Sequence, residues 1–244
     1  MIYLICGEKM ERVQKVIANR GYTSRRNAEK LIEEGKVKVN GNIVKLGDKI
    51  NENDKIEIEG KEICANDNKV YYLLNKPRGV ISSVKDDKGR KTVVDLINAN
   101  ERIYPIGRLD YNTTGLIILT NDGNLSNHLT HPKNKVIKTY LAKCKGVINK
   151  EQINKLKNGI YIDNRKVDII DFKVKKIDNQ KNITFISISI IEGRNHIVKR
   201  IFESIGLLVD KLTRTNYDFL TIGNLKSGEY RRLSIKEVKK LYRN

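Results

Sequence analysis

The sequence predicts an α+β fold in two parts, a small N-terminal domain followed by a larger domain built on a mixed, mostly antiparallel β-sheet flanked by helices. Two observations support this fold class: segments with alternating apolar residues occur beside segments with helical spacing, and no regular βαβ period connects them. The 244 residues are enough for two hydrophobic cores. A polar stretch at residues 64–69 predicts a linker, so we expect domains at residues 10–63 and 70–244, with an N-terminal extension at residues 1–9.

The first part begins with two predicted helices. Residues 10–20 carry apolar side chains at helical spacing and stop at Gly21, and Thr23 or Ser24 can cap a second helix that ends at Gly35. Strands follow, because apolar residues alternate with lysines and an Asn-Gly pair predicts a hairpin turn. These strands are expected at Val37 and Val39, after Asn40-Gly41, and around Ile50, Ile56 and Ile58.

The second part mixes strands with short helices. Strands are expected at Tyr71–Leu74, Leu116–Leu119, Lys138–Lys143 and Ile186–Ile190, and Ile103–Ile106 leads into the loop of Asp110. Helices are expected near Leu125–Leu129, over Glu151–Asn158 before Gly159, and over residues 196–205. In the last of these helices, a turn of about 100° per residue gathers the apolar side chains on one arc and places Lys199 on the opposite arc.

Composition points to a nucleic-acid partner. The chain has 48 Lys+Arg against 29 Asp+Glu, a formal net charge of +19 and a pI of about 9.7. Such an excess of positive charge favours binding to phosphates, which weakens steeply as salt increases. The first part is close to neutral, with 12 basic and 10 acidic residues between residues 10 and 63, so its basic side chains must be concentrated on one face.

Several classes of protein are excluded or disfavoured. Three widely spaced cysteines without a Cys-x-x-Cys motif indicate neither a disulfide framework nor a zinc site, and they suit a reducing cytoplasm. No apolar stretch approaches the roughly 18 residues that span a membrane. The phosphate-binding, dinucleotide-binding and hydrolase motifs rich in glycine are absent from the sequence. His128 and His131 lack a third ligand at a suitable spacing, so we expect a loop role and no metal.

One carboxylate stands out in this basic chain. Asp110 lies between Gly107-Arg108 and the Thr114-Gly115 turn, and a buried strand is predicted directly after it. Carboxylates are ionised at neutral pH, and Arg108 can favour the charged form. Asp110 is therefore a nucleophile or a structural anchor. As a nucleophile acting on RNA, it has two candidate targets, the ribose C1′ of a nucleoside and C6 of a pyrimidine.

The first part resembles the S4 RNA-binding domain. The resemblance lies in Glu11–Lys15, Thr23–Glu29 and Val37–Gly41, and it covers nearly the whole unit. It implies that structured RNA binds to a basic helical face. The residues that would form this face are Arg12, Lys15, Arg20, Arg25, Arg26 and Lys30.

The second part resembles the RNA pseudouridine synthases, in the branch that carries an N-terminal S4 domain and modifies ribosomal RNA. The matching segments are Asn75–Gly79, Gly107–Asp110, Thr114–Leu116, Thr120–Gly123, Lys138–Leu141 and Glu192–Arg200. The resemblance implies isomerisation of uridine without cofactor or metal, with Asp110 as the nucleophile, Tyr140 stacking on a flipped uracil and Lys199 as the basic partner of Asp110. It leaves open whether C1′ or C6 is attacked.

The same resemblance implies RNA contacts around the site. They are expected from Lys76, Arg78, Arg108, Arg194, His196 and Arg200, although Arg108 can instead pair with Asp110 and Arg194 can instead order its own loop. The expected partner is ribosomal RNA or a pre-ribosomal particle, bound by a monomer. Tyr111, Thr113 and Thr114 look most like members that act on large-subunit RNA. Small-subunit RNA is the alternative substrate, and a non-catalytic assembly factor that only binds RNA is the alternative function.

Overall fold

The computed structural model describes residues 10–64 and 68–243 and divides the chain into two compact units. The first unit ends at Val70 and also includes Asn100–Arg102, and the second comprises Tyr71–Ala99 and Ile103–Asn244. The predicted extension at residues 1–9 and residues 65–67 of the predicted linker lie outside the described residues.

The first unit pairs two helices with small sheets. Helix α1 (Val13–Asn19) begins three residues later than predicted, whereas α2 (Arg25–Glu33) is capped by Ser24, whose side chain accepts a hydrogen bond from the backbone of Asn27. One sheet has the order β3-β2-β5-β6, and β1 pairs with β4. The strands are β1 (Glu11–Arg12), β2 (Val37–Val39), β3 (Asn42–Ile43), β4 (Lys49–Ile50), β5 (Ile56–Ile58) and β6 (Lys61–Ile63). Their alternating valines and isoleucines form one core with the apolar faces of the helices.

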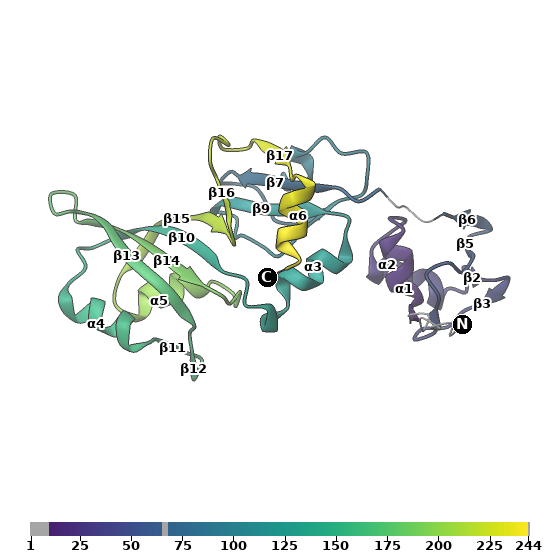
Figure 1. The fold of residues 1–244 in the computed structure, drawn as a ribbon, viewed down its shortest axis with the longest axis horizontal. Coiled ribbons are helices and arrows are strands. Elements are labelled where there is room, and N and C mark those ends of the chain that lie inside the picture. Colours follow the sequence, from purple (N-terminus) through teal and green to yellow (C-terminus); the bar gives the residue numbers. More distant parts are fainter. Residues whose placement is uncertain (1–9, 65–67, 244) are drawn as a thin grey trace, which may run out of the picture. The chain divides into compact units, whose positions relative to one another are not determined.

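The second unit is built on one nine-stranded sheet of the described residues, with the main order β13-β14-β10-β15-β9-β7-β17 (Figure 1). Its main strands are β7 (Tyr71–Lys76), β9 (Thr114–Thr120), β10 (Lys138–Lys145), β13 (Ile169–Asp178), β14 (Ile183–Ile190), β15 (Leu208–Tyr217) and β17 (Tyr230–Arg232). Two short strands, β8 (Tyr104–Pro105) and β16 (Leu220–Thr221), pair with β9 and β15. The pairing of β9 with β15 is parallel and the other pairings are antiparallel. The mixed, mostly antiparallel sheet predicted from the sequence is confirmed.

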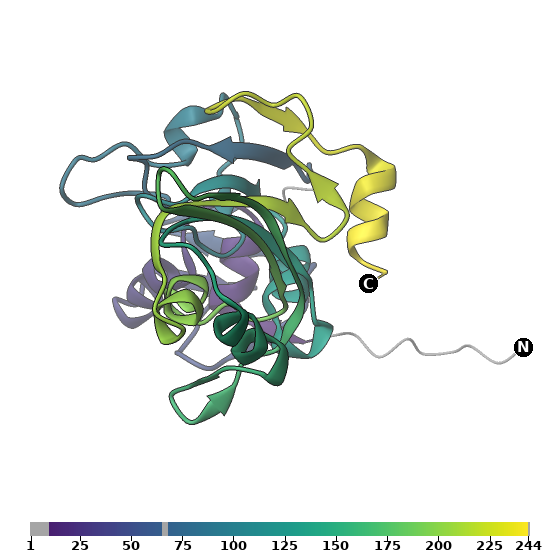
Figure 2. The same cartoon turned by 90° about the vertical axis from the view of Figure 1, so that its left-hand side faces the viewer.

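Helices cover the two halves of this sheet separately. Helices α3 (Gly123–Thr130) and α6 (Ile235–Leu241) contribute Leu125, Leu129 and Leu241 to a core with residues of β7 and β9. Helices α4 (Lys150–Asn158) and α5 (Ile197–Ser204) lie on the concave side of the curved β13–β14–β10–β15 half (Figure 2). The remaining elements are β11 (Tyr161–Ile162), β12 (Arg165–Lys166) and the 3-10 turns η1 (Val94–Leu96) and η2 (Pro132–Asn134).

The two halves of the sheet meet where β9 runs parallel to β15. Gly115 on β9 pairs with Arg214 on β15 at a φ of +104°, and a Cβ atom at position 115 would lie 2.2 Å from the Arg214 carbonyl oxygen. Only glycine allows so close an approach of the two backbones. The Thr114-Gly115 turn of the sequence therefore joins the halves directly after the loop that carries Asp110.

Candidate active site

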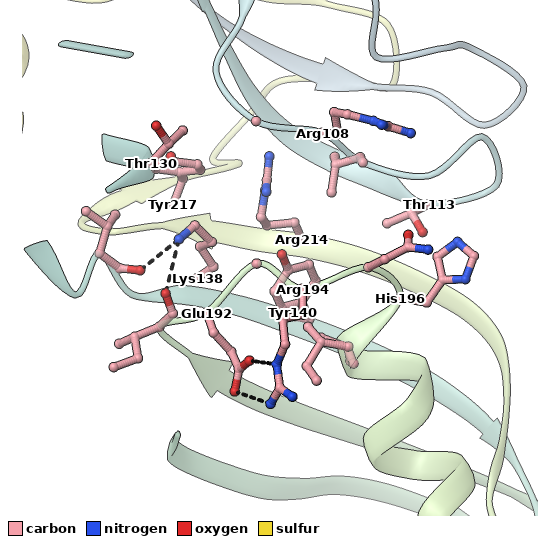
Figure 3. Close-up of a pocket in the computed structure, with 18 of the residues that line it drawn as sticks. Arg108, Thr113, Thr130, Lys138, Tyr140, Glu192, Arg194, His196, Arg214 and Tyr217 are labelled. Atoms are coloured by element: carbon pink, nitrogen blue, oxygen red, sulfur yellow. Dashed lines mark hydrogen bonds and ion pairs between the residues drawn. The ribbon is translucent and has the colours of Figure 1, made fainter. Parts of the chain in front are cut away.

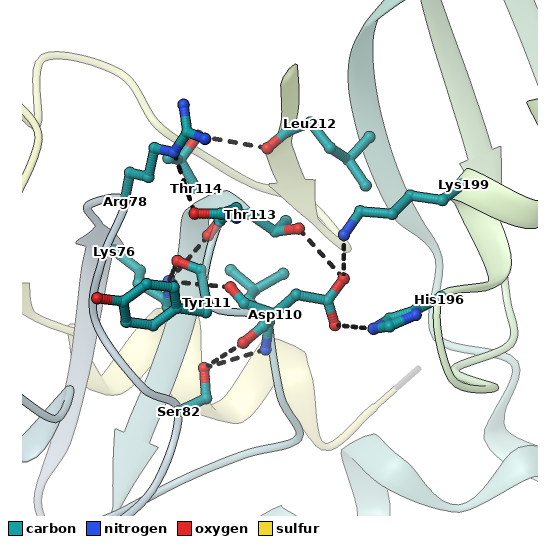
Figure 4. Close-up of polar contacts among 12 residues, drawn as sticks. Lys76, Arg78, Ser82, Asp110, Tyr111, Thr113, Thr114, His196, Lys199 and Leu212 are labelled. Carbon is teal, nitrogen blue, oxygen red and sulfur yellow. Dashed lines mark hydrogen bonds and ion pairs between the residues drawn. The ribbon is translucent and has the colours of Figure 1, made fainter. Parts of the chain in front are cut away.

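The loop that carries Asp110 is held by a buried lysine. Lys76, at the end of β7, is fully buried, and its Nζ lies within hydrogen-bond distance of four backbone carbonyl oxygens, those of Pro77 (3.1 Å), Asp110 (3.2 Å), Tyr111 (3.4 Å) and Thr113 (2.9 Å), which share its three hydrogens (Figure 4). Burial lowers the pKa of Lys76 to about 8, although the charge of Asp110 acts in the opposite direction. The prediction that Lys76 contacts RNA is therefore wrong, because its ammonium group is buried and hydrogen-bonded to backbone carbonyl oxygens.

A second set of bonds fixes the same loop from the other side. The Ser82 hydroxyl donates to the carbonyl oxygen of Leu109 (2.8 Å) and accepts from the Leu109 amide (3.1 Å), and the Gly79 amide donates to Tyr111 (2.9 Å). Arg78, which is exposed, donates through Nε to Asn112 Oδ1 (3.1 Å). The backbone on both sides of Asp110 is thus anchored to the segment after β7, so only the Asp110 side chain can change its conformation.

The Asp110 carboxylate is bound by two side chains from the start of α5. Lys199 Nζ lies 2.7 Å from Oδ2, and His196 Nε2 lies 3.3 Å from Oδ1 (Figure 4). The Thr113 hydroxyl lies 3.5 Å from Oδ2. The family resemblance implies the Lys199 contact, whereas His196 was expected to contact RNA. His196 sits at the N-cap of α5 with a φ of 54°, a rare conformation that aims its ring at the carboxylate.

Asp110 opens onto a pocket of about 870 Å³. This volume lies in the range of small-molecule sites and accommodates one nucleotide. Tyr140 on β10 is only 8% exposed and forms part of the pocket wall (Figure 3). The lining includes seven Lys or Arg residues against three Asp or Glu residues, so the pocket is suited to an anionic polymer.

Three residues of β10 and β15 that line the pocket were not expected from the sequence to belong to the site, namely Lys138, Arg214 and Tyr217. Arg214 is 2% exposed, its Nε donates to the Leu116 carbonyl oxygen at 2.6 Å, and its guanidinium lies 5.0 Å from the centre of the Tyr217 ring. The Lys138 Nζ lies 5.7 Å from the same ring centre. An arginine within the run Leu208–Tyr217 carries no sequence signal of burial, because only the parallel pairing with β9 encloses it.

The other arginines predicted around the site behave differently. Arg108 is exposed on the pocket rim and forms no ion pair with the described part of the chain. The positive charge beside Asp110 comes instead from Lys199 on α5. Arg194 pairs with Glu192 and donates to the Ile162 carbonyl oxygen at 2.7 Å, which orders its own loop. Arg200 forms a bidentate ion pair with Asp163, with Nη1 2.8 Å from Oδ2 and Nη2 2.5 Å from Oδ1. Of these three, only Arg108 keeps an exposed, unpaired guanidinium.

The basic side chains of the first unit divide in a similar way. Arg20 donates to three backbone carbonyl oxygens, those of Glu52 (2.6 Å), Asp54 (2.6 Å) and Ile63 (2.9 Å), and so ties α1 to the strands. Its guanidinium therefore has a structural role within the unit, and its RNA contact stays a prediction. Lys15 pairs with Glu11. The remaining predicted residues are exposed, namely Arg12, Arg25, Arg26 and Lys30.

The described residues offer neither a metal-binding cluster nor a membrane-spanning helix. No group of three or more His, Cys, Asp or Glu side chains is arranged to hold a metal ion within residues 10–64 and 68–243. His131 Nδ1 accepts a hydrogen bond from the Lys133 amide at 3.3 Å, which is a bond within its own loop. None of the described helices has both the length and the apolar character needed to cross a membrane.

Each of the two units matches a known protein family. The family model for RNA pseudouridylate synthase matches residues 70–204, and the S4 domain model matches residues 11–56. The chain is 51% identical to ribosomal large subunit pseudouridine synthase B of Bacillus subtilis, over 95% of this chain and 96% of that protein. It is 39% identical to an RNA pseudouridine synthase of Aquifex aeolicus, over 95% and 94% of the two chains.

A solved structure supports the same assignment. The crystal structure of a pseudouridylate synthase superposes with a TM-score of 0.66 at 32% identity, and it covers 94% of this chain and 99% of that chain. The match thus extends over both units, including the loop that carries Asp110 and the strand that carries Tyr140. The chain therefore belongs to the RNA pseudouridylate synthase family, with an S4 domain preceding its synthase domain.

Proposed function

We propose that this enzyme isomerises one specific uridine of ribosomal RNA to pseudouridine, and that its substrate is the large-subunit RNA. The name of the Bacillus subtilis relative, which shares half of its residues with this chain, supports the choice of subunit. The observation that carries the assignment of the site is the 2.7 Å pair of Asp110 and Lys199 at the mouth of a basic pocket. The partner is ribosomal RNA or a pre-ribosomal particle, bound by a monomer in the cytoplasm.

In this proposal Asp110 is the nucleophile. Its backbone is fixed by Lys76 and Ser82, so little conformational freedom is lost when the carboxylate attacks. Lys199 keeps the carboxylate charged and oriented through Oδ2. The contact of His196 with Oδ1 is longer and more exposed, so it is the contact that opens to give the nucleotide access.

The target uridine must leave the RNA stack to reach Asp110, because a base within a helix keeps C1′ and C6 away from side chains. Tyr140 provides an aromatic face for the flipped uracil inside the pocket. Attack at C1′ and attack at C6 both suit this arrangement. Exposed Arg108 on the rim and the exposed cations of α2 hold the surrounding RNA.

The nucleophile is tested with ribosomal RNA that carries tritium at C5 of its uridines. Formation of pseudouridine replaces the C5 hydrogen, so tritium is released by the wild-type enzyme. The Asp110→Asn variant is expected to release none while it binds the RNA with unchanged affinity. Asp168→Asn removes another acid of the same pocket and serves as the matched control, with release near the wild-type rate.

Two outcomes would contradict the proposal. Release by Asp110→Asn at the wild-type rate would exclude Asp110 as the nucleophile. Absence of release by the wild-type enzyme from any ribosomal RNA fragment, with binding intact, would favour the assembly factor that only binds RNA. Mapping pseudouridines in both ribosomal RNAs of cells with and without the protein identifies the target uridine and decides between the two subunits.

A further inference from the structure

Two cations lie on the floor of the pocket without an acidic partner. Arg214 makes one hydrogen bond through Nε, to the Leu116 carbonyl oxygen, whereas its Nη2 is buried and has no hydrogen-bond partner among the residues that the structure describes. Lys138 Nζ donates to the carbonyl oxygens of Val136 (3.1 Å) and Ile191 (3.5 Å). Neither side chain forms an ion pair within residues 10–64 and 68–243.

This arrangement is energetically costly in the absence of a ligand. Both cations lie over the ring of Tyr217, and burial together with the charge of Arg214 lowers the pKa of Lys138 to about 8 (Figure 3). A buried donor without an acceptor costs free energy, and so does the approach of two like charges in a medium of low polarity. A ligand that brings acceptor oxygens or negative charge would remove both costs.

The register of the sheet places this pair beside the reacting base. Arg214 on β15 is directly opposite Tyr140 on β10, and on its other side it is opposite Gly115 on β9. Opposite residues of neighbouring strands have Cβ atoms about 5 Å apart. Arg214 therefore lies in the sheet between Tyr140, which forms the aromatic wall of the pocket, and β9, the strand that follows the Asp110 loop.

We propose that Arg214 and Lys138 form a subsite for the carbonyl oxygens of the flipped uracil and stabilise the negative charge that the ring acquires during the reaction. This inference rests on the proposed function, since it requires a uracil stacked on Tyr140. The guanidinium of Arg214 donates to a ring oxygen, and Lys138 adds a second positive charge to the same region. An oxygen whose negative charge develops inside a dry pocket gains most from donors that are already in place.

Both candidate targets of Asp110 create such charge. If C1′ is attacked, the bond from the Asp110 oxygen to C1′ forms as the C1′–N1 bond breaks, and the bonding pair stays on the ring, spread over N1, O2 and O4. Bonding of C5 to C1′ then returns the carboxylate, and the proton lost from C5 is balanced by one gained at N1. If C6 is attacked, the Asp110 oxygen bonds to C6, the electron pair of the C5–C6 double bond moves toward C4 and the charge lies on O4. The C1′–N1 bond then breaks as C5 bonds to C1′, and loss of the C5 proton expels the Asp110 oxygen from C6 while N1 gains a proton.

The test combines variants of the enzyme with substitutions of single atoms in the RNA. Single-turnover rates are measured on RNA with uridine, 2-thiouridine or 4-thiouridine at the mapped target, because sulfur is a poor hydrogen-bond acceptor. For the wild-type enzyme, at least one thio substitution is expected to slow the reaction about tenfold. For Arg214→Met the same substitution is expected to change the rate less than twofold, because the contact is already absent. The acidity change caused by sulfur is common to both enzymes and cancels in the comparison.

Control variants distinguish loss of the subsite from loss of folding and from loss of the overall activity. Arg165→Met removes an exposed arginine of the same pocket and is expected to keep the full thio effect. Lys138→Met, which leaves the bond of Arg214 to Leu116 in place, is expected to reduce the thio effect and provides the test if Arg214→Met does not fold. If the thio effects of the wild type, Arg214→Met and Lys138→Met are equal in folded proteins, the subsite is overturned. The proposed function still stands in that case, provided that the wild-type enzyme is active on normal RNA.

Discussion

The two units of the protein hold their basic residues in opposite ways. On α2 of the first unit, Arg25, Arg26 and Lys30 are exposed, so they can move, are screened by salt and suit a phosphate backbone of variable shape. In the second unit Lys76 and Arg214 are buried and bonded to backbone carbonyl oxygens. An exposed cation contributes to affinity at little cost to folding, whereas a buried one costs folding energy and gives a fixed position in return.

The largest effect is expected where burial depends on a single glycine. In Gly115→Ala, the new Cβ would lie 2.2 Å from the carbonyl oxygen of Arg214, so β9 and β15 must separate and expose the arginine. We expect a loss of about 4 kcal/mol or more in the stability of the second unit. Gly89→Ala is the matched control, because Gly89 also has a positive φ but has nothing within 4 Å of the new atom, and backbone strain alone costs about 1 kcal/mol. Because the chain has no tryptophan, urea unfolding is followed by circular dichroism. Equal losses in both variants would contradict the close approach.

The next effect concerns the partner of the nucleophile. In Lys199→Met the Asp110 carboxylate loses its 2.7 Å partner and with it a fixed orientation toward the nucleotide, so we expect a loss in kcat of about 10²-fold, which corresponds to about 3 kcal/mol in the activation free energy. Arg200→Gln, on the same helix but paired with Asp163 at the surface, is expected to change kcat less than threefold. Rates are measured with saturating RNA. A similar loss in both variants would show that α5 as a whole, and not the pair with Asp110, determines the rate.

Lys76 predicts a dependence of stability on pH. Its pKa falls to about 8 in the folded protein from 10.5, so between pH 8 and 10.5 the unfolded chain binds a proton that the folded chain has released. Wild-type stability is therefore expected to rise with pH through this window relative to Lys76→Met, by up to about 3 kcal/mol. Other groups that titrate in this range are present in both proteins and cancel. The difference in the free energy of unfolding is measured at several pH values from 7 to 10.5, and a flat difference would show that the ammonium is not held in its protonated form at a cost.

How far the sequence predicts this contrast depends on the kind of interaction. The helix capped by Ser24, the strand that follows Asp110 and the helix that presents Lys199 all follow from local patterns of apolar residues and caps. Contacts between distant segments have no such pattern. Lys76 and Arg214 look like solvated residues in the sequence, yet the pairing of β7, β9 and β15 buries them. The family resemblance identified Asp110 and Lys199 as partners, but the geometry of the sheet was needed to place Arg214 beside Tyr140.

The smallest effect is expected on the exposed side of the contrast. Lys30 on α2 and Lys38 on β2 are both exposed lysines of the first unit, so changing each to glutamine removes the same charge from different faces. If the helical face binds RNA, Lys30→Gln should weaken binding about threefold and reduce the slope of log affinity against log salt by about 1, because one phosphate contact is lost. Lys38→Gln should change neither quantity, and kcat should stay constant in both variants. Binding is measured by titration of labelled ribosomal RNA at several salt concentrations. Equal losses in the two variants would mean that the first unit attracts RNA by its total charge, and the distinction between a specific basic face and a diffuse one would disappear.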